Sequence, residues 1–389
     1  MNKRELLMIP GPIEFEPAVM QAMAIPTPSH VAPEFVEVFG RSLEALRKVF
    51  LAAPDSQPFI LAGSGTLAMD AAVANLIEPG DRAVVVNTGY FSDRMAAIAE
   101  RYGAQVTQVR AEVGDSPPLA AIAEALAQGD TKLLLATHVD TSTGVKVDVE
   151  PLGKLARSHG ALSVVDGVCA TAAEVFRQAD WDIDVCLTAS QKAIGVPPGL
   201  ALLVLSGQAM AVFERRRTPV QSYYSDFALW LPVMRAYESR KPAYFGTPAV
   251  NLVLALDVSL QGILAEGMEA RFERHRRLSG AFKAAMTAIG LKQVPLRPEV
   301  TAATLTCPYY PDGVDAKVLG KVRANGAVLA GGLHPAIRER YFRVGHMGAV
   351  TASDILATAG AIERALAETG YRFDVGAGVA AAQRALVEG

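Results

Sequence analysis

Short apolar runs alternate with longer segments of helical periodicity along the first half of the chain. The runs that are long enough for a strand, and mostly lack polar alternation, cover residues 83–86, 132–136, 162–165 and 200–204. Such runs are typical of strands buried on both faces of a parallel sheet. Helices are expected over residues 66–77, 91–102, 118–128 and 149–159, each followed closely by a glycine. This rhythm predicts right-handed strand–helix–strand units and an α/β fold.

The pattern changes after Met210. A segment rich in aromatics and arginines precedes a long predicted helix over 248–277, and a further strand is expected over 299–306. No Gly/Ser-rich or Pro-rich linker marks a boundary. The change of pattern places an N-terminal segment at 1–20, a large domain at 21–270 and a small C-terminal α/β domain at 271–389.

Composition excludes several classes of function. The 37 basic and 40 acidic side chains leave a net charge of −3, which gives no basic field to hold nucleic acid or an acidic membrane surface. No apolar run approaches the roughly 18 residues of a membrane span, and Leu6–Ile9 is too short for a signal peptide. We therefore expect a cytoplasmic protein with no membrane or nucleic-acid partner.

The cysteines and histidines do not form a metal site in the sequence. Three widely spaced cysteines lack zinc spacing, and we expect them to be buried core residues in a reducing compartment. His138, His159 and His346 likewise have no ligand spacing to one another. No metal is predicted.

Three local motifs carry candidate chemistry. Gly63–Thr66 stands directly before a predicted helix, where free amides and hydroxyls hold phosphate, although a tight turn with an N-cap explains the motif equally well. Asp166 ends an apolar strand, and its side chain could pair with a cationic ring nitrogen or merely cap the next turn. Lys192 follows another short strand and precedes the turns of Gly195–Gly199. Lysine is ordinarily a solvated surface residue, but this setting suits a held amine.

Together these motifs match the phosphate, ring nitrogen and aldehyde of pyridoxal 5'-phosphate (PLP). With Ser190-Gln191-Lys192 followed by Pro197-Pro198-Gly199, the chain resembles the class V aminotransferases of PLP fold type I, and among them the alanine–glyoxylate/serine–pyruvate group. The resemblance extends from residues 10–12 to residues 343–348. It implies a large PLP-binding domain with a mainly parallel seven-stranded sheet between helices, and a smaller C-terminal α/β domain.

The resemblance implies several roles in holding the cofactor. Lys192 would form the internal Schiff base, Asp166 would keep the ring nitrogen protonated, and Val168 would pack against one face of the ring. Phe91 stands where relatives often have a stacking tryptophan, with Tyr90 as a rival for that role. The phosphate would be held by Ser64, Gly65, Thr66 and Gln191.

Other implied roles concern the substrate and a second subunit. Arg343 would clamp the substrate carboxylate, because a guanidinium fork matches a carboxylate in two hydrogen bonds. Ser142 would line the site near the substrate and the ring hydroxyl, and Gly11 would also contact the substrate. Tyr244 and Thr247 would reach the phosphate from the other subunit, which implies a homodimer with shared active sites.

The implied reaction moves an amino group from alanine or serine to glyoxylate or pyruvate. Lys192, freed from the cofactor by the amino acid, would move the Cα proton, and a second 2-oxo acid would complete a ping-pong cycle. Alternative donors are pyridoxamine, ureidoglycine, an aminophosphonate or aspartate. Aspartate is disfavoured, because no second arginine is evident for its side-chain carboxylate.

Two readings outside transamination are weaker. A PLP lyase of the cysteine desulfurase type shares the fold, but typically has histidine where Gln191 stands and needs a mobile reactive cysteine. Cys307 instead lies in an apolar stretch. A protein that only binds a ligand or a partner would leave Lys192 unused, and the intact set of motifs argues against that.

Overall fold

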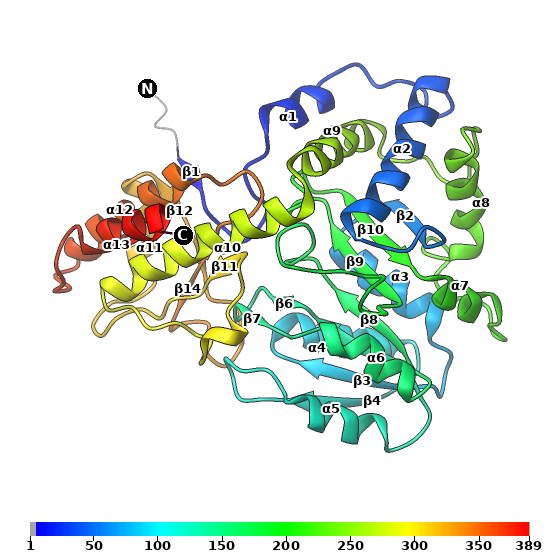
Figure 1. Ribbon diagram of the computed structural model, residues 1–389, viewed down its shortest axis with the longest axis horizontal. Helices are drawn as coiled ribbons and strands as arrows, with labels where there is room; N and C mark the ends of the chain where they lie inside the picture. The colour runs from blue at the N-terminus through cyan, green and yellow to red at the C-terminus, as the bar shows by residue number, and fades with distance from the viewer. Residues whose placement is uncertain (1–4, 389) are drawn as a thin grey trace.

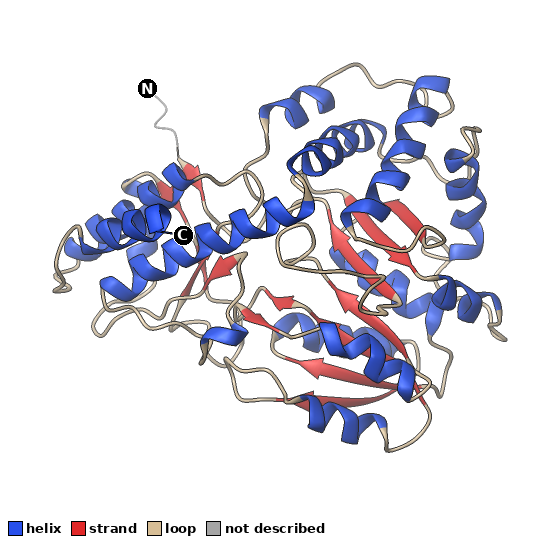
Figure 2. Ribbon diagram, in the orientation of Figure 1, coloured by secondary structure: helices blue, strands red, loops and turns tan. Residues whose placement is uncertain are grey.

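The computed structural model describes residues 5–388, which form a large part built on a central sheet and a smaller part with most of the C-terminal residues (Figure 1). Helices surround the strands of the large part (Figure 2). The helices are α1 (Pro17–Met23), α2 (Pro33–Val49), α3 (Gly65–Leu76), α4 (Tyr90–Arg101), α5 (Leu119–Leu126), α6 (Glu150–Ser158), α7 (Gly207–Glu214), α8 (Phe227–Glu238), α9 (Val250–Glu266), α10 (Met268–Ala288), α11 (Val318–Ala324), α12 (Ala352–Ala367) and α13 (Ala377–Glu388).

The strands divide between the same two parts. They are β1 (Leu6–Leu7), β2 (Gln57–Ala62), β3 (Arg82–Asn87), β4 (Gln105–Arg110), β5 (Thr131–Thr137), β6 (Val139–Asp140), β7 (Val145–Lys146), β8 (Leu162–Asp166), β9 (Val185–Ala189), β10 (Leu200–Leu205), β11 (Leu305–Thr306), β12 (Ala327–Val328), β13 (Ala330–Gly331) and β14 (Phe342–Gly345). The predicted strands and helices of the first half are confirmed, with shifts of one or two residues at their ends.

The central sheet has seven strands in the order β2-β10-β9-β8-β5-β3-β4. It is mainly parallel, as expected, and only β10 runs antiparallel to its neighbours β2 and β9. The ten residues 190–199 between β9 and β10 are too few for a parallel crossover, which needs about a dozen or more. All residues of β8, β9 and β10 are buried, so helices cover both faces of the sheet centre.

The long helix expected over 248–277 is wrong in one respect, because two helices occupy that region. α9 and α10 are bent by 87° at Gly267, whose φ of 86° lies outside the helical region and suits glycine. Apolar periodicity continues on both sides, so the pattern did not reveal the bend. Among residues 5–388, no single helix could cross a membrane, although this bent pair passes by length and composition.

The strand expected over 299–306 is also largely wrong. A 3₁₀ turn covers Pro298–Val300, and only Leu305–Thr306 is a strand. The residues between them bond to loops of the large part: the Ala302 amide donates to the Gly144 carbonyl, and the Ala303 amide donates to the Glu174 carboxylate. This segment therefore joins the two parts of the molecule.

The smaller part includes the first described residues as well as the C-terminal ones. β1 pairs in parallel with β12, and Met8 packs in an apolar cluster with side chains of α10 and α12. α10 contributes Phe272 to the core of the large part and Leu278 to that of the smaller part. The domain boundaries expected from the sequence stay a prediction.

Candidate active site

The candidate site lies where several strands of the central sheet end. β2, β3, β5, β8 and β9 all run in the same direction, so their carboxyl ends lie at one edge of the sheet. The predicted site motifs follow these ends: Gly63–Thr66 follows β2, Tyr90 and Phe91 follow β3, Asp166 ends β8, and Gln191 and Lys192 follow β9. The fold thus brings together motifs that are far apart in sequence.

These segments enclose a cavity of ≈ 170 Å³. Its lining residues are Gly11, Ser64, Gly65, Thr66, Met69, Phe91, Arg94, Val139, Thr141, Asp166, Val168, Cys169, Gln191 and Lys192. Nine of the residues expected from the sequence are in this set. Phe91 lines the cavity and Tyr90 does not, which favours Phe91 for the stacking role.

The N-terminus of α3 forms one end of the cavity. Ser64 is the N-cap residue, with an extended backbone, yet its side chain makes no capping hydrogen bond. The reading of this motif as a simple N-cap therefore has no support. Gly65 is required sterically, because a Cβ there would lie 2.8 Å from the Val168 side chain. Uncapped amides at a helix N-terminus attract an anion.

Asp166 is buried at the end of β8, with its Oδ1 accepting a hydrogen bond from the Val168 amide at 2.9 Å. Burial, with a smaller contribution from the nearby Asp140, raises the pKa of Asp166 to about 7, although the hydrogen bond from the Val168 amide lowers it. The positive charges of Lys192 and Arg94 act in the opposite direction. A cationic group in the cavity would therefore be strongly favoured beside this carboxylate.

Lys192 extends into the same cavity from the loop after β9. Its Nζ donates a hydrogen bond to the Pro10 carbonyl, and burial lowers the pKa of its amine. Gly11 leaves room for this side chain, because a Cβ there would lie within 2.9 Å of Lys192 Cδ, Cε and Nζ. A buried lysine with a lowered pKa is more readily neutral, and a neutral amine is a nucleophile and a base.

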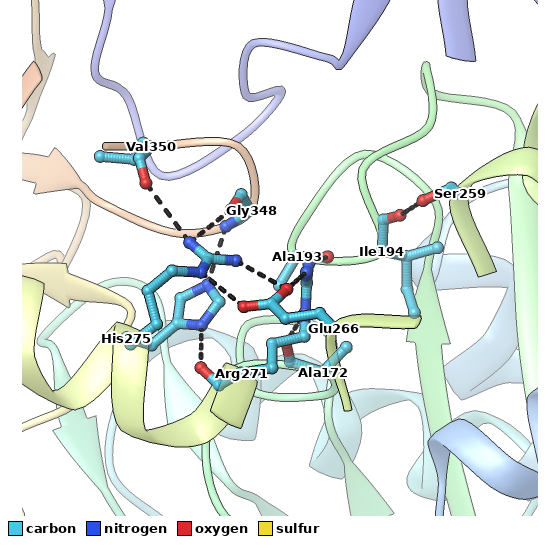
Figure 3. A network of polar contacts seen from close by, with 10 residues as sticks. Ala172, Ala193, Ile194, Ser259, Glu266, Arg271, His275, Gly348 and Val350 are labelled. Atoms are coloured by element: carbon cyan, nitrogen blue, oxygen red, sulfur yellow. Dashed lines mark hydrogen bonds and ion pairs between the residues drawn. The ribbon is translucent and has the colours of Figure 1, made fainter. Parts of the chain in front are cut away.

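A buried polar network holds the loop that carries Lys192 (Figure 3). Arg271 of α10 donates to the Ala193 carbonyl and to the Ala172 carbonyl, each at 2.7 Å, and also pairs with Glu266 at 2.7 Å. One guanidinium thereby ties the segment after Asp166 to the segment after Lys192. Ser259 of α9 donates to the next carbonyl, that of Ile194.

The same network reaches the loop after β14. Arg274 bonds both oxygens of Glu266 and the Gly348 carbonyl, while the Gly348 amide donates to His275 Nε2 at 3.0 Å (Figure 3). His275 is buried, and burial lowers its pKa to about 3, so its ring is neutral and accepts this bond. The bend between α9 and α10 thus fixes the lysine loop relative to the smaller part.

Sequence reasoning missed two charged residues at the site. Asp140, at the end of β6, is buried and accepts hydrogen bonds from the Phe91 and Ser92 amides at the start of α4. Arg94 lines the cavity one turn after Phe91, and its Nη1 donates to Thr66 Oγ1 at 2.8 Å. The helical spacing of Phe91 and Arg94 was the available signal, because residues three apart share a helix face.

Ser142 and Arg343 lie next to the cavity and are absent from its lining. The Ser142 hydroxyl donates to Asp140 Oδ1 at 2.5 Å and accepts from the Tyr90 amide at 3.0 Å, so it already has two partners. Arg343 of β14 donates to the Gly331 carbonyl at 2.8 Å and to the carbonyl of Thr141, a lining residue, at 3.3 Å. Its guanidinium is therefore at the border of the site.

Tyr244 and Thr247 are exposed and contribute nothing to the cavity of their own chain. Tyr244 is 65% exposed, and its ring lies 5.4 Å from that of His30. Their expected role across a subunit interface stays a prediction. No group of acidic, histidine or cysteine side chains within residues 5–388 could hold a metal ion, and the three cysteines are free and buried.

The lining residues fit PLP. The uncapped N-terminus of α3 suits a phosphate, Asp166 suits a cationic ring nitrogen, and the buried Lys192 amine suits an aldehyde. Among the described side chains, the buried Gln191 Oε1 is one of few polar atoms without a hydrogen-bond partner. This oxygen accepts hydrogen bonds only, so it would need a donor on a bound group, whereas the NH2 of the same amide is the end that could donate to a phosphate.

Comparison with known proteins agrees with this chemistry. The family model described as Aminotransferase class-V matches residues 26–357. Alanine–glyoxylate aminotransferase 1 of Saccharomyces cerevisiae is 42% identical, over 88% of this chain and 92% of its own. L-aspartate–glyoxylate aminotransferase of Paracoccus denitrificans is 32% identical, over 98% and 96%.

Solved structures give the same result for the fold. The crystal structure of pyridoxamine-pyruvate aminotransferase from Mesorhizobium loti has a TM-score of 0.93 and 26% identity, covering 99% of this chain and 98% of that one. The expected PLP fold type I is thereby confirmed. From the family match, the close relatives and the shared fold, we conclude that this chain belongs to the class-V aminotransferase family, whose cofactor is PLP.

Proposed function

We propose that this aminotransferase moves the amino group of a small amino acid, alanine or serine, to glyoxylate or pyruvate. The observation that carries the proposal is a single cavity lined by the Lys192 amine, the Asp166 carboxylate and the uncapped N-terminus of α3. The name of the yeast relative supports alanine and glyoxylate as a substrate pair. The Paracoccus relative makes aspartate the first alternative donor.

Four features of the cavity would hold the cofactor. Residues Ser64–Thr66 and Gln191 would hold its phosphate, Asp166 would face its ring nitrogen, and Lys192 would bond to its aldehyde. PLP supplies that aldehyde, and a ring that accepts electrons from the substrate Cα. Val168 and Phe91, both in the lining, would border the ring.

Lys192 would act on the substrate as a proton carrier. Burial lowers the pKa of its amine, so the neutral form is available to take a proton from the substrate Cα. Asp166 would stay ionised opposite a cationic nitrogen, because an opposite charge favours the carboxylate form. The network around Arg271 would keep the Lys192 loop in place during the proton transfer.

Arg343 would bind the substrate carboxylate. Its Nε and Nη1 donate to the Gly331 and Thr141 carbonyls, which fixes the plane of the guanidinium beside the cavity. A fixed guanidinium gives a carboxylate two parallel hydrogen bonds at little entropic cost. Both the amino acid and the 2-oxo acid carry such a carboxylate, so one residue serves both halves of the cycle.

The cysteine desulfurase reading loses support from the cysteine environment. Cys307 is buried, burial raises the pKa of its thiol, and its Sγ lies against Gly144. A reactive cysteine needs an exposed, electropositive setting. Cys307 is not exposed, and burial outweighs the lowering of its thiol pKa by the Arg343 and Lys283 charges.

We also propose a homodimer in which Tyr244 and Thr247 of one chain reach the cofactor phosphate of the other. Both residues are exposed and absent from the lining of their own chain's cavity, which supports this arrangement. Exposed large apolar side chains on nearby segments would be covered in the dimer: Met20, Ile25, Val31, Tyr223 and Tyr224. A cytoplasmic location stays a prediction.

A screen of amino donors against glyoxylate and pyruvate tests the proposed substrates. We expect alanine or serine with glyoxylate to give the highest kcat/KM, with aspartate, pyridoxamine and ureidoglycine as the comparison set. A preference for aspartate would contradict alanine or serine as the amino donor, but the protein would still be an aminotransferase. No product from any pair would contradict the proposed function.

A further inference from the structure

Arg94 is the second cation in the cavity, beside Lys192. It lies on α4, three residues after Phe91 and four after Tyr90, so all three side chains share one face of the helix. The guanidinium carbon lies 5.2 Å from the centre of the Tyr90 ring and 5.0 Å from that of the Phe91 ring. These two cation–π contacts hold the guanidinium over the cavity wall.

Arg94 has no carboxylate within salt-bridge distance in the described chain, although its charge also acts on the buried Asp166. Its hydrogen bond goes from Nη1 to Thr66 Oγ1, a neutral acceptor, and within residues 5–388 it forms no ion pair with a carboxylate. Arg110 makes a useful contrast, because it pairs with Asp93, the residue next to Arg94, at 2.5 Å. A half-buried guanidinium without a carboxylate partner is a ready site for an anion.

The position of Thr66 indicates which anion. Thr66 lies in the first turn of α3, beside the uncapped Ser64, so the Arg94 guanidinium lies at the same end of the cavity as the free amides. A phosphate monoester carries about −1.5 to −2 charges, whereas a helix N-terminus supplies only about half a positive charge. Lys192 is committed to the aldehyde, which leaves Arg94 to balance the phosphate.

We propose that Arg94 binds the cofactor phosphate, together with Thr66 and the amides that begin α3; this inference rests on the proposed function. Nε and Nη2 of the guanidinium would remain to donate to phosphate oxygens, while Nη1 keeps the Thr66 hydroxyl in place. Arg94 then serves the cofactor, and Arg343 remains the arginine for the substrate. The alternative is that Arg94 binds the side-chain carboxylate of a dicarboxylic donor such as aspartate.

Binding of PLP and of pyridoxal, which lacks the phosphate, separates these roles. Cofactor-free wild type, Arg94→Gln and Arg94→Lys would be titrated with each compound, and Arg101→Gln, an exposed arginine on the same helix, would serve as the matched control. We expect Arg94→Gln to raise the Kd of PLP by roughly 10- to 100-fold, with the Kd of pyridoxal unchanged. The Kd of Arg94→Lys for PLP should lie between those of wild type and Arg94→Gln, because lysine keeps the positive charge but lacks the paired N–H donors of the guanidinium.

Other outcomes overturn the assignment in distinct ways. Equal losses for PLP and pyridoxal would mean that Arg94 supports the fold or the ring rather than the phosphate. If Arg94→Gln left the PLP affinity unchanged and raised the KM for aspartate but not for alanine, Arg94 would bind the side-chain carboxylate of the substrate instead. A wild-type protein that binds neither compound would overturn the proposed function, and this inference with it.

Discussion

The lysine side of the cavity and the surface around Tyr244 are built in opposite ways. Lys192 and Asp166 are buried, and bonds within the chain hold their loops, among them those from Arg271 to the Ala172 and Ala193 carbonyls. Tyr244, in contrast, is 65% exposed, and its ring lies near that of His30. One chain thus positions the reacting groups, whereas the role proposed for Tyr244 at the cofactor phosphate requires a second chain.

Loss of the Lys192 amine should have the largest effect. Lys192→Ala should abolish turnover, because no other lysine among residues 5–388 lines the cavity. Borohydride reduction of the wild-type holoprotein, followed by peptide mapping, should place the label on Lys192. A label on Lys146 or Lys241 would contradict the assignment of Lys192 as the residue that bonds to the cofactor.

Asp166→Asn should have the next largest effect. The variant should retain cofactor but lose about 100- to 1,000-fold in kcat, because a neutral amide does not stabilise a cationic ring nitrogen. Steady-state kinetics and cofactor content would be measured together, with the exposed Asp180→Asn as a control. Near wild-type turnover would mean that Asp166 merely caps the turn at Val168.

Acid should lower the free energy of unfolding through the buried histidines. Burial lowers the pKa of His275 to about 3 in the folded chain. Below about pH 6.5 the His275 ring therefore binds a proton in the unfolded chain but not in the folded chain. Stability should therefore fall as pH drops below about 6.5, by about 1.4 kcal/mol per pH unit for this residue. His138 and His346 are buried with similarly lowered pKa values and add to the trend.

In the cofactor-free protein, Asp166 acts in the opposite direction. Its raised pKa of about 7 means that the folded chain binds a proton more tightly, so its contribution to stability grows as pH falls from about 7 to about 4. The free energy of unfolding of wild type and of His275→Gln, measured with denaturant at pH 5 and pH 7, gives the contribution of His275 to the pH dependence. An equal loss of stability in both proteins would show that His275 is not a buried neutral base.

The smallest effect is expected at the exposed surface. Tyr244→Phe should weaken PLP retention by roughly tenfold, the value of one hydrogen bond to a charged group, and leave the Lys192 chemistry intact. Mixing Lys192→Ala chains with Tyr244→Phe chains should restore one kind of site, because wild-type Lys192 and wild-type Tyr244 would belong to different chains. A monomer that is fully active at assay dilution would refute the shared site.

Local signals explain what the sequence could predict. Asp166 at a strand end and Lys192 before the turns of 195–199 are each readable within a short window, and the parallel sheet then brings them together. Long-range contacts have no such signal. The bond from Arg94 to Thr66 joins two helices, and the pairing of β1 with β12 joins Leu6–Leu7 to Ala327–Val328.

The missed elements have the same physical origin. The bend at Gly267 is stabilised by Arg271 and Arg274, which bond loops far away in the sequence, so helical periodicity alone could not reveal it. Residues 301–304 are placed by bonds to Gly144 and Glu174 and by a single bridge from Thr301 to Val145 of β7, instead of by a continuous strand pairing. Tertiary contacts, more than local preference, decide both regions.

The most direct test of the account is a single half-reaction with the wild-type holoprotein. Alanine is added without any 2-oxo acid, and pyruvate and ammonia are quantified. We predict a burst of about one equivalent of pyruvate per cofactor, with no ammonia and no further turnover until glyoxylate is added, as a ping-pong aminotransferase requires. Continuous release of ammonia, or no pyruvate from alanine, serine or aspartate, would contradict amino transfer at Lys192.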